Sequence, residues 1–505
     1  MASTDTNTLR IDQLMTESGV QFGTSGARGL VVAMTDRVCY AYTLAFLQHL
    51  KASQQLGRQA KIAIAGDYRS STPRILTAVA AAISDFGLTP EFCGYIPSPA
   101  VASYGMAEGV PSMMVTGSHI PDDRNGIKFN TATGEILKGD EAGIKTQSVS
   151  LPSLRFDDKG ILSVAKPFAL PPYSAHAYQQ YIERYVRFFP AKFLAGKNIG
   201  LYQHSSVGRE VFADILLALG ASVTKLGYSD KFISVDTEAI RPEDVQLARQ
   251  WAQSNRFDAI ISADGDADRP LVSDEHGEWL RGDIAGILCA RYLKADVVAT
   301  PVSSNTAVEK CGFFRQISRT RIGSPFVVAA MQTALPDARG PVVGYEANGG
   351  FLTASDVVVG GRRLPALPTR DSILVPLAVL ALAQEKNQSV AQLAATLPPR
   401  YTASNRVEHF PTALSAAKLK VLNSGDVARD KTAIEGIFAK DFGAVSNINT
   451  IDGVRITFAN GEIVHLRPSG NAPEFRCYNE ADTAARANAM NERCMAIIAE
   501  WKRAH

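Results

Sequence analysis

Residues 263–270, ADGDADRP, bring three carboxylates close together in the chain: Asp264, Asp266 and Asp268. Negative charges at this density repel one another unless a cation joins them, and carboxylate oxygens are the ligands that hard divalent ions prefer. Arg269 follows at once, and a guanidinium beside a metal suits a phosphoryl oxygen. The spacing therefore predicts a Mg²⁺-type site, against the plain alternative of an acidic turn exposed to solvent.

An EF-hand calcium loop is the competing interpretation of this segment, because the three aspartates and Glu275 stand at the ligand positions of such a loop. The sixth position of an EF-hand requires glycine, but here it is Arg269, and Pro270 follows it. The flanking segments FDAIISA and PLVSD are typical of strands rather than of two helices. We therefore expect the acidic loop to connect two strands.

A second segment, VTGSHIPDDRNGIKF (115–129), carries groups that can accept phosphate or move protons. Ser118 and His119 alone indicate a plain turn, since no G-x-S-x-G elbow surrounds the serine. Lys128 changes this interpretation, because a lysine in an otherwise apolar strand lies either at an exposed edge or in a cleft where it transfers a proton. These residues are candidate catalytic groups.

A third segment, RPSGNAPEFR (467–476), can direct several hydrogen-bond donors at one anion. The donors are the guanidinium of Arg467, the hydroxyl of Ser469, the backbone of Gly470 and the amide of Asn471. Arginine binds oxyanions through two parallel hydrogen bonds, and consecutive backbone N–H groups form anion-binding concavities. From these residues alone, a turn between two strands explains the segment equally well.

The fourth segment, GYEANGG (344–350), is a glycine-rich turn that presents Glu346 and Asn348. An acidic acceptor beside an amide suits the adjacent hydroxyls of a sugar. The segment is a weak signal by itself.

A strand–turn–helix unit that recurs along the chain would position these loops. It is clearest at 61–87 and 197–220, and it returns more loosely at 296–312. In the first copy the helix begins with a hydroxyl residue before Pro73 and ends at Gly87. Proline is common in the first turn of a helix and glycine just after its last turn. Strands that alternate with helices predict mainly parallel sheets covered by helices. Three related α/β domains are therefore expected.

The end of the chain differs, because GVRITFANGEIVHLR alternates around Asn460-Gly461 and predicts a β-hairpin. A further strand, EFRCY, and a helix from about Asp482 complete an α+β domain. A Pro-rich stretch at 165–176 marks the first boundary, before a helix at 175–189. The predicted domains are 1–168, 169–285, 286–400 and 401–505.

The composition predicts a globular protein that is not a general binder of nucleic acid. The chain has 505 residues, with 52 Lys and Arg against 50 Asp and Glu, and a general nucleic-acid binder needs a basic surplus. Arg362, Arg363 and Arg370 remain local candidates for anion binding. The six cysteines lack metal-like spacing, the N-terminus lacks a signal-peptide pattern, and the longest apolar run, 373–383, is too short to span a bilayer. A cytoplasmic protein is predicted.

Taken in order, the four loops resemble the α-D-phosphohexomutase family, whose motifs are T-[AG]-S-H-N-P, D-G-D-x-D-R, G-E-x-[SN]-G and R-P-S-G-T-x-P. FGTSGARG (22–29), GDYRSS (66–71) and IPSPA (96–100) are similar to further motifs of that family. The resemblance covers nearly the whole chain. It implies a heart-shaped molecule of three mixed α/β domains and a C-terminal α+β domain around a central cleft.

The resemblance also implies roles at the reacting end of the cleft. Ser118 is expected to be the phosphorylated serine, and its phosphate is expected to share a Mg²⁺ ion with the three aspartates. Lys128 and Arg28 are expected at the reacting phosphoryl, with His119 and Lys128 as acid–base groups. Arg269 is expected to steady the same region.

At the other end, the resemblance implies contacts to the substrate. Glu346 and Asn348 are expected to hold sugar hydroxyls. The remaining predicted substrate-binding residues are Arg467, Ser469, Gly470 and Asn471, which would bind the substrate's phosphate, together with Gly323 and Arg476.

The implied reaction moves a phosphate between C1 and C6 of a hexose, through a phosphoserine enzyme and a hexose 1,6-bisphosphate that also serves as activator. The motif set is closer to members grouped as phosphomannomutases, which favours mannose or glucose phosphates. Two alternatives remain. One is a phosphoglucosamine or N-acetylglucosamine-phosphate mutase, since the E-A-N-G loop is similar to that of N-acetylhexosamine-phosphate mutases, and the other is a metal-dependent sugar phosphatase. A monomer or a homodimer is expected.

Overall fold

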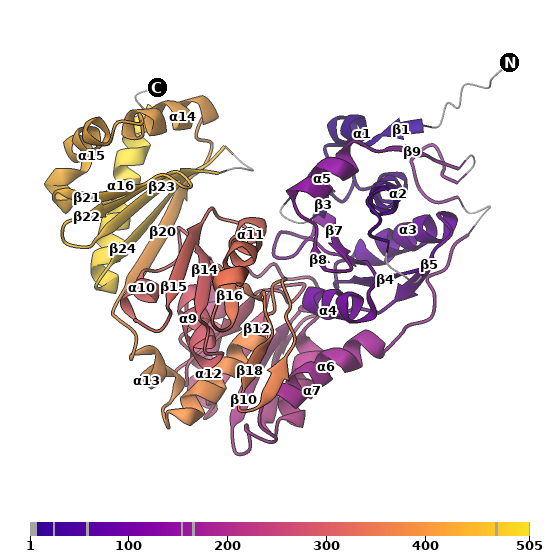
Figure 1. Ribbon diagram of the computed structural model, residues 1–505, viewed down its shortest axis with the longest axis horizontal. Coiled ribbons are helices and arrows are strands. Elements are labelled where there is room, and N and C mark those ends of the chain that lie inside the picture. The colour runs from indigo at the N-terminus through magenta and orange to yellow at the C-terminus, as the bar shows by residue number, and fades with distance from the viewer. Residues whose placement is uncertain are drawn as a thin grey trace.

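The structure, a computed structural model, describes residues 8–23, 26–56, 60–152, 155–163, 167–469 and 473–503. Four domains follow one another along the chain in a heart-shaped outline (Figure 1). Domains 2 and 3 form its base, and domains 1 and 4 rise from the base as two lobes, with the two ends of the chain on different lobes (Figure 1). This confirms the predicted fold class.

Domain 1 is built on a seven-stranded sheet in the order β2-β3-β7-β6-β4-β5, with β8 paired to β7. Its strands are β2 (Gln21–Phe22), β3 (Gly26–Leu30), β4 (Lys61–Gly66), β5 (Thr89–Phe92), β6 (Ser112–Val115), β7 (Arg124–Thr131) and β8 (Gly134–Glu135), and β1 (Thr8–Arg10) pairs separately with β9 (Ser148–Ser150). Its helices are α1 (Ile11–Ser18), α2 (Asp36–Ala52), α3 (Thr72–Asp85), α4 (Ser98–Glu108) and α5 (Lys138–Lys145).

Domains 2 and 3 each contain a four-stranded sheet. Domain 2 comprises α6 (His176–Phe188), β10 (Asn198–His204), α7 (Arg209–Ala218), β11 (Ser222–Tyr228), α8 (Pro242–Ser254), β12 (Ala259–Ala263) and β13 (Pro270–Val272). Domain 3 comprises α9 (Gly282–Tyr292), β14 (Val297–Pro301), α10 (Ala307–Lys310), β15 (Gln316–Thr320), α11 (Ser324–Ala334), η1 (Leu335–Asp337), β16 (Val342–Tyr345), β17 (Phe351–Thr353), β18 (Val357–Val359), β19 (Arg362–Leu364), α12 (Leu374–Glu385) and α13 (Val390–Ala394).

The three α/β domains repeat one strand order. In domain 2 it is β11-β10-β12-β13 and in domain 3 it is β15-β14-β16-β17, and in both the first two pairings are parallel and the last is antiparallel. Domain 1 contains the same arrangement as β5-β4-β6-β7. The three segments singled out in the sequence supply β4, β10 and β14, so they occupy equivalent places in their sheets.

Domain 4 is an antiparallel sheet in the order β20-β24-β23-β22-β21, with helices on it. Its elements are β20 (Tyr401–Val407), α14 (Thr412–Leu422), α15 (Val427–Phe442), β21 (Val445–Asn449), β22 (Val454–Phe458), β23 (Ile463–Pro468), β24 (Phe475–Ala481) and α16 (Ala484–Arg503). The predicted hairpin joins β22 to β23, and Gly461 in its turn has a φ of 80°, which glycine adopts at little cost.

The cores show which domains act together. One cluster of buried apolar residues runs through domains 1, 2 and 3, from Ala63 on β4 to Val343 on β16. The cluster inside domain 4, from Phe410 to Ile498, is separate from it among the described residues. Domains 1 to 3 are therefore packed as one body, to which domain 4 is attached.

The predicted domain limits stay predictions. Residue 400 directly precedes β20, whereas residue 285 lies within α9, which packs against α12. Within the described part of the chain, no helix combines the length and apolar character needed to cross a bilayer.

A buried arginine shapes the loop between β6 and β7, which carries Ser118. Arg69 is 1% exposed, and its Nη1 and Nη2 atoms donate to four carbonyls, those of Ser118, Ile120, Pro121 and Arg124, at 2.6–2.9 Å. Its Nε donates to Asp67 at 3.1 Å. One side chain thus satisfies the backbone acceptors of an irregular loop that has no strand partner.

Replacing this arginine is expected to unfold the loop. In Arg69→Met, the four carbonyls lose their donor and the buried carboxylate of Asp67 loses its cation, so the free energy of unfolding should fall by about 3–5 kcal/mol. The matched control is Arg249→Met, which breaks an exposed ion pair with Glu278 and should cost at most about 1 kcal/mol. Urea denaturation followed by circular dichroism measures both; equal losses would contradict the role given to Arg69.

Candidate functional site

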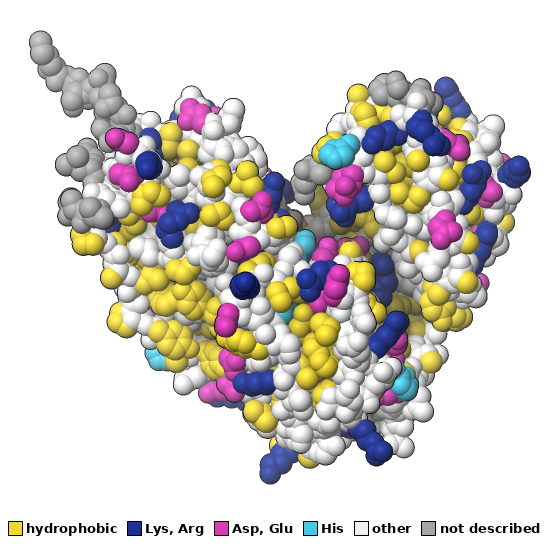
Figure 2. All heavy atoms as spheres, turned by 180° about the vertical axis from the view of Figure 1, so that it is seen from behind, with side chains coloured by type: hydrophobic (Ala, Val, Ile, Leu, Met, Phe, Trp, Pro, Cys, Tyr) yellow, Lys and Arg dark blue, Asp and Glu magenta, His cyan; other side chains and the backbone are white. Residues whose placement is uncertain are grey.

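A central cleft separates the two lobes of the molecule, and Figure 2 shows the surface hollowed between them. The cavity in it measures about 990 Å³ and is lined by residues of all four domains. The sequence-predicted residues that line it are Arg28, Ser118, His119, Lys128, Arg269, Gly323, Glu346, Asn348, Arg467, Ser469 and Arg476. Segments that lie far apart in the chain therefore face one space.

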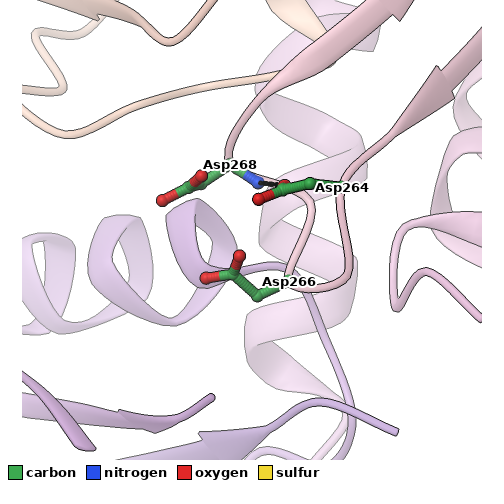
Figure 3. A group of neighbouring side chains, drawn as sticks. All are labelled: Asp264, Asp266 and Asp268. Carbon is green, nitrogen blue, oxygen red and sulfur yellow. Dashed lines mark hydrogen bonds between the residues drawn. The ribbon is translucent and has the colours of Figure 1, made fainter. Parts of the chain in front are cut away.

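The three aspartates lie on the tight loop between β12 and β13, as predicted from the strand-like flanks. One oxygen from each of Asp264, Asp266 and Asp268 lies within 4.8 Å of the others, and all three side chains are buried. Figure 3 shows them turned to the same side of the loop, with the backbone N–H of Asp268 donating to Asp264 at 3.1 Å. Since Asp264 also accepts from the N–H of Arg269, its second oxygen is left for other partners.

The donor set fits a hard divalent cation. Oδ1 of Asp266 and Oδ1 of Asp268 are buried without a hydrogen-bond partner. Burial raises the pKa of Asp264 far above its usual range, and the charges of Asp266 and Asp268 add to this effect. Buried carboxylate oxygens without donors, crowded by like charges, are the arrangement that a bound Mg²⁺ would stabilise.

Three domains fix the backbone of this loop. From domain 1, the N–H of Ser98 at the start of α4 donates to the carbonyl of Asp266 at 2.9 Å. From domain 2, Ser206 donates to the carbonyl of Asp264 at 2.8 Å. From domain 3, Ser372 donates to the carbonyl of Ala267 at 2.5 Å. The loop therefore keeps its shape only where the three domains meet.

Ser118 lies directly beside this acidic loop. Its Oγ donates to Oδ2 of Asp264 at 2.8 Å, and its φ of 56° places a non-glycine residue in the left-handed region. The strained backbone turns the hydroxyl toward the aspartates while Arg69 holds the carbonyl of the same residue. A serine oxygen and three carboxylates thus meet in space.

His119 lies next to the serine, with Nδ1 at 3.4 Å from Oγ of Ser118. Burial, together with the positive charges of Arg269 and Arg28, lowers the pKa of His119 to about 2. The imidazole is therefore neutral in this state of the site. Burial also lowers the pKa of Arg28 to about 10, again with the help of Arg269, so that Arg28 remains a cation at neutral pH.

Lys128 reaches the aspartates from strand β7. Its Nζ lies 2.6 Å from Oδ2 of Asp266 and 2.6 Å from Oδ2 of Asp268. Burial alone would lower the pKa of Lys128, but the two carboxylates outweigh it and the pKa is raised. The amine is held as a cation in the cleft, which excludes the alternative of an exposed edge; its transfer of a proton stays a prediction.

The glycine-rich loop after β16 forms the wall contributed by domain 3. The carboxylate of Glu346 accepts from Arg370 at 2.7 Å, and Oδ1 of Asn348 accepts from the N–H of Gly350 at 3.0 Å. Gly323 precedes α11 with a φ of 126°, a conformation that side-chain-bearing residues rarely adopt.

Domain 4 contributes a row of arginines. Arg467 on β23 stands directly opposite Arg476 on β24, which in turn stands opposite Arg406 on β20. Like charges directly opposite one another on a sheet are unfavourable unless an anion lies between them. Asp452 pairs with Arg467 at 2.8 Å, and the N–H of Ser469 donates to the carbonyl of Glu474. The predicted Gly470 and Asn471 lie outside the described residues.

The sequence did not identify several residues that belong to the site. The motifs GDYRSS and IPSPA contain Asp67, Arg69 and Ser98. These motifs contributed to the family resemblance but indicated no role for the three residues in the site. Arg370 could not be separated from Arg362 and Arg363, although only Arg370 is buried in the cleft. Arg406 carries no motif, and only strand pairing places it beside Arg476.

Comparison with known proteins agrees with this architecture. Four models of the phosphoglucomutase/phosphomannomutase family match in chain order: alpha/beta/alpha domain I at residues 19–151, domain II at 176–277, domain III at 281–401 and the C-terminal domain at 418–497. Together they cover most of the chain.

Individual proteins are similar over nearly the full length. A phosphomannomutase of Salmonella muenchen is 43% identical over 93% of this chain and 94% of its own. A probable phosphoglucosamine mutase of Methanocella arvoryzae is 26% identical over 94% of this chain and 97% of its own. The crystal structure of a putative phosphomannomutase from Thermus thermophilus superposes with a TM-score of 0.69 at 17% identity, covering 95% of this chain and 99% of that one.

The four matched domains, their order and the 43% identity over nearly all of both chains lead to one conclusion. This chain belongs to the phosphoglucomutase/phosphomannomutase family, the phosphohexomutases that its loops resemble.

Proposed function

We propose that this protein is a phosphomannomutase that interconverts mannose 1-phosphate and mannose 6-phosphate, and that it also accepts the corresponding glucose phosphates. The observation that carries the proposal is the 2.8 Å contact between Oγ of Ser118 and Asp264, in a cleft whose opposite wall bears arginines. The similarity to a named phosphomannomutase supports mannose as the sugar.

The reaction stores one phosphoryl group on Ser118. A free hydroxyl oxygen of the bound hexose phosphate attacks the phosphorus of the phosphoserine. The bond from that phosphorus to Oγ of Ser118 breaks, and the proton of the attacking hydroxyl ends on Oγ. The product is a hexose 1,6-bisphosphate. The bisphosphate then reorients in the cleft and Oγ attacks its other phosphorus. The bond from that phosphorus to the sugar oxygen breaks, the proton of Oγ ends on that sugar oxygen, and the hexose leaves with its phosphate on the other carbon. Each transfer makes one phosphorus–oxygen bond and breaks one.

The residues around Ser118 suit this transfer. His119 is the proposed acid–base group on geometric grounds, because its Nδ1 lies 3.4 Å from Oγ of Ser118. The cations Arg28, Lys128 and Arg269 line the same region and balance the charge of the moving group. Mg²⁺ held by the three aspartates would supply further charge neutralisation for the phosphoryl oxygens.

The opposite wall would hold the phosphate that does not react. Arg467 and Arg476 stand side by side and line the cleft, and Glu346 and Asn348 line the same cleft as acceptors and donors for sugar hydroxyls. A second anion anchor favours a mutase over the alternative of a sugar phosphatase, because a hydrolase needs no grip on the far end of its substrate.

The phosphoglucosamine and N-acetylglucosamine-phosphate alternatives rest on the E-A-N-G loop. The probable phosphoglucosamine mutase compared above is 26% identical, against 43% for the phosphomannomutase, which favours mannose. A cytoplasmic location and a monomeric or homodimeric state stay predictions.

A substrate panel tests the proposed function. The enzyme is primed with the matching 1,6-bisphosphate and Mg²⁺ and given mannose, glucose, glucosamine or N-acetylglucosamine 1-phosphate. We expect hexose 6-phosphate from mannose 1-phosphate with the highest kcat/KM, followed by glucose 1-phosphate. A preference for an amino sugar would move the enzyme to the phosphoglucosamine class, and release of free phosphate would identify a phosphatase.

Ser118→Ala should abolish turnover. Because the variant lacks the oxygen that carries the phosphoryl group, kcat should fall by ~10³-fold or more. Intact-mass spectrometry after incubation with hexose 1,6-bisphosphate should show one added phosphoryl group on the wild-type chain and none on the variant. Ser70→Ala removes an exposed serine from the same domain and should retain both properties. Phosphorylation of the Ser118→Ala chain at full stoichiometry would disprove the assignment.

Metal binding should stabilise the folded chain through the three aspartates. Mg²⁺ at about 100 times its dissociation constant should add about 2.7 kcal/mol to the free energy of unfolding, seen as a higher Tm than in EDTA. Asp266→Asn should lose this shift. Glu275→Gln should keep it, since the side chain of Glu275 contacts the backbone of Ala391 instead; loss of the shift in Glu275→Gln would restore the EF-hand interpretation.

A further inference from the structure

Arg370 connects two loops of the site, the glycine-rich loop after β16 and the acidic loop between β12 and β13. Its Nε donates to Oε2 of Glu346 at 2.7 Å, and its Nη1 lies 3.6 Å from Oδ2 of Asp268. The residue is 4% exposed and lines the central cavity. A guanidinium therefore stands between the residue proposed to hold the sugar and a residue proposed to hold the metal.

The room for this side chain comes from Gly350. A Cβ atom built on Gly350 would lie 2.5 Å from Cδ of Arg370, 2.9 Å from Cγ and 3.0 Å from Nε. The backbone of Gly350 is not in the left-handed region that favours glycine, so space and not conformation requires the absence of a side chain. Gly350 and Arg370 thus form one unit, in which the loop closes directly over the arginine.

The guanidinium has donors to spare. Among the described residues, its hydrogen bonding is limited to the contact from Nε to Glu346, and the distance from Nη1 to Asp268 exceeds that of a hydrogen bond. An arginine guanidinium stays protonated in proteins and offers only donors. The site thus contains a permanent cation whose side chain lines the cavity.

We propose that Arg370 is a further substrate-binding residue of this enzyme. Its Nε orients the carboxylate of Glu346 toward the sugar, and its Nη groups donate to an oxygen of the hexose phosphate located between Glu346 and Asp268. This inference rests on the proposed function. It adds a residue that ties the position of the sugar to the position of the reacting phosphoryl group.

Two substitutions at Arg370 test the proposal. Arg370→Gln removes the charge and the fork, and kcat/KM for mannose 1-phosphate should fall by ~10²-fold or more, because Glu346 and the substrate oxygen both lose their donor. Arg370→Lys keeps the charge but cannot direct separate donors at Glu346 and at the substrate oxygen. It should therefore recover less than about a tenth of the activity that Arg370→Gln loses. Arg363→Gln, at an exposed arginine paired with Asp356, is the matched control and should leave kcat/KM unchanged.

A second readout separates substrate binding from a purely structural role. Mannose 6-phosphate is titrated calorimetrically into the chain carrying Ser118→Ala in EDTA, where neither turnover nor metal contributes. Adding Arg370→Gln should weaken binding by ~10-fold or more. Thermal melts confirm that each variant is folded at the temperature of the assay. If Arg370→Gln fails to fold, Arg370→Lys, which keeps a cation beside Glu346, carries the comparison.

Gly350→Ala tests the same unit without touching the arginine. The new methyl group displaces the side chain of Arg370, so this variant should lose activity nearly as strongly as Arg370→Gln. When Gly350→Ala is added to Arg370→Gln, it should cost little more activity, because the guanidinium contacts that the methyl group disturbs are already lost. This non-additivity marks the coupling between the two positions.

The outcomes distinguish the inference from the function on which it rests. If the wild-type enzyme converts no hexose 1-phosphate of the panel, the proposed function fails. If the wild type is active and Arg370→Gln retains its kcat/KM and its affinity for mannose 6-phosphate, the function stands and the inference is overturned.

Discussion

The concentration of buried negative charge on the loop between β12 and β13 is the constraint on which the site depends. Three carboxylates with their oxygens within 4.8 Å of one another cannot all be ionised in a buried setting without cations nearby. The structure provides Lys128 from domain 1 and Arg370 from domain 3, and a divalent ion would add more charge. The cations that would attract a phosphoryl group are thus the same cations that stabilise the acidic loop.

This constraint explains why three domains meet at one point. The backbone of the acidic loop is held by Ser98, Ser206 and Ser372, one from each α/β domain, and the serine loop is held by Arg69. A continuous apolar core runs through the same three domains. The groups proposed to transfer the phosphoryl therefore lie on a rigid body, as a reaction that depends on positioning requires.

Domain 4 stands apart from this body, with a core of its own and a row of arginines. Near the cleft it contacts domain 3 through Asp452, whose carboxylate accepts from the N–H of Ile322 and from Arg467. An anion bound by Arg467 would compete with Asp452 for the same guanidinium. The arginines proposed to bind the substrate's phosphate thus lie on a domain whose apolar core, among the described residues, is separate from the core that joins the other three domains.

Local patterns in the sequence determined much of this protein. The strand-turn-helix units, the hairpin at Asn460-Gly461 and the two strands around the aspartates follow from hydrophobic alternation, turn residues and short-range geometry, and the motifs around Ser118 and Asp264 pointed to their chemistry. Only the tertiary structure decided that Ser118 and Asp264 lie 2.8 Å apart, that Lys128 pairs with the aspartates, and that Arg370 is buried beside Gly350 while Arg362 and Arg363 are exposed. The contacts of Ser118 and Lys128 with the aspartates join different domains, and the contact of Arg370 with Gly350 joins two loops of domain 3. All of these distances depend on how whole sheets and loops pack, which no local pattern in the chain encodes.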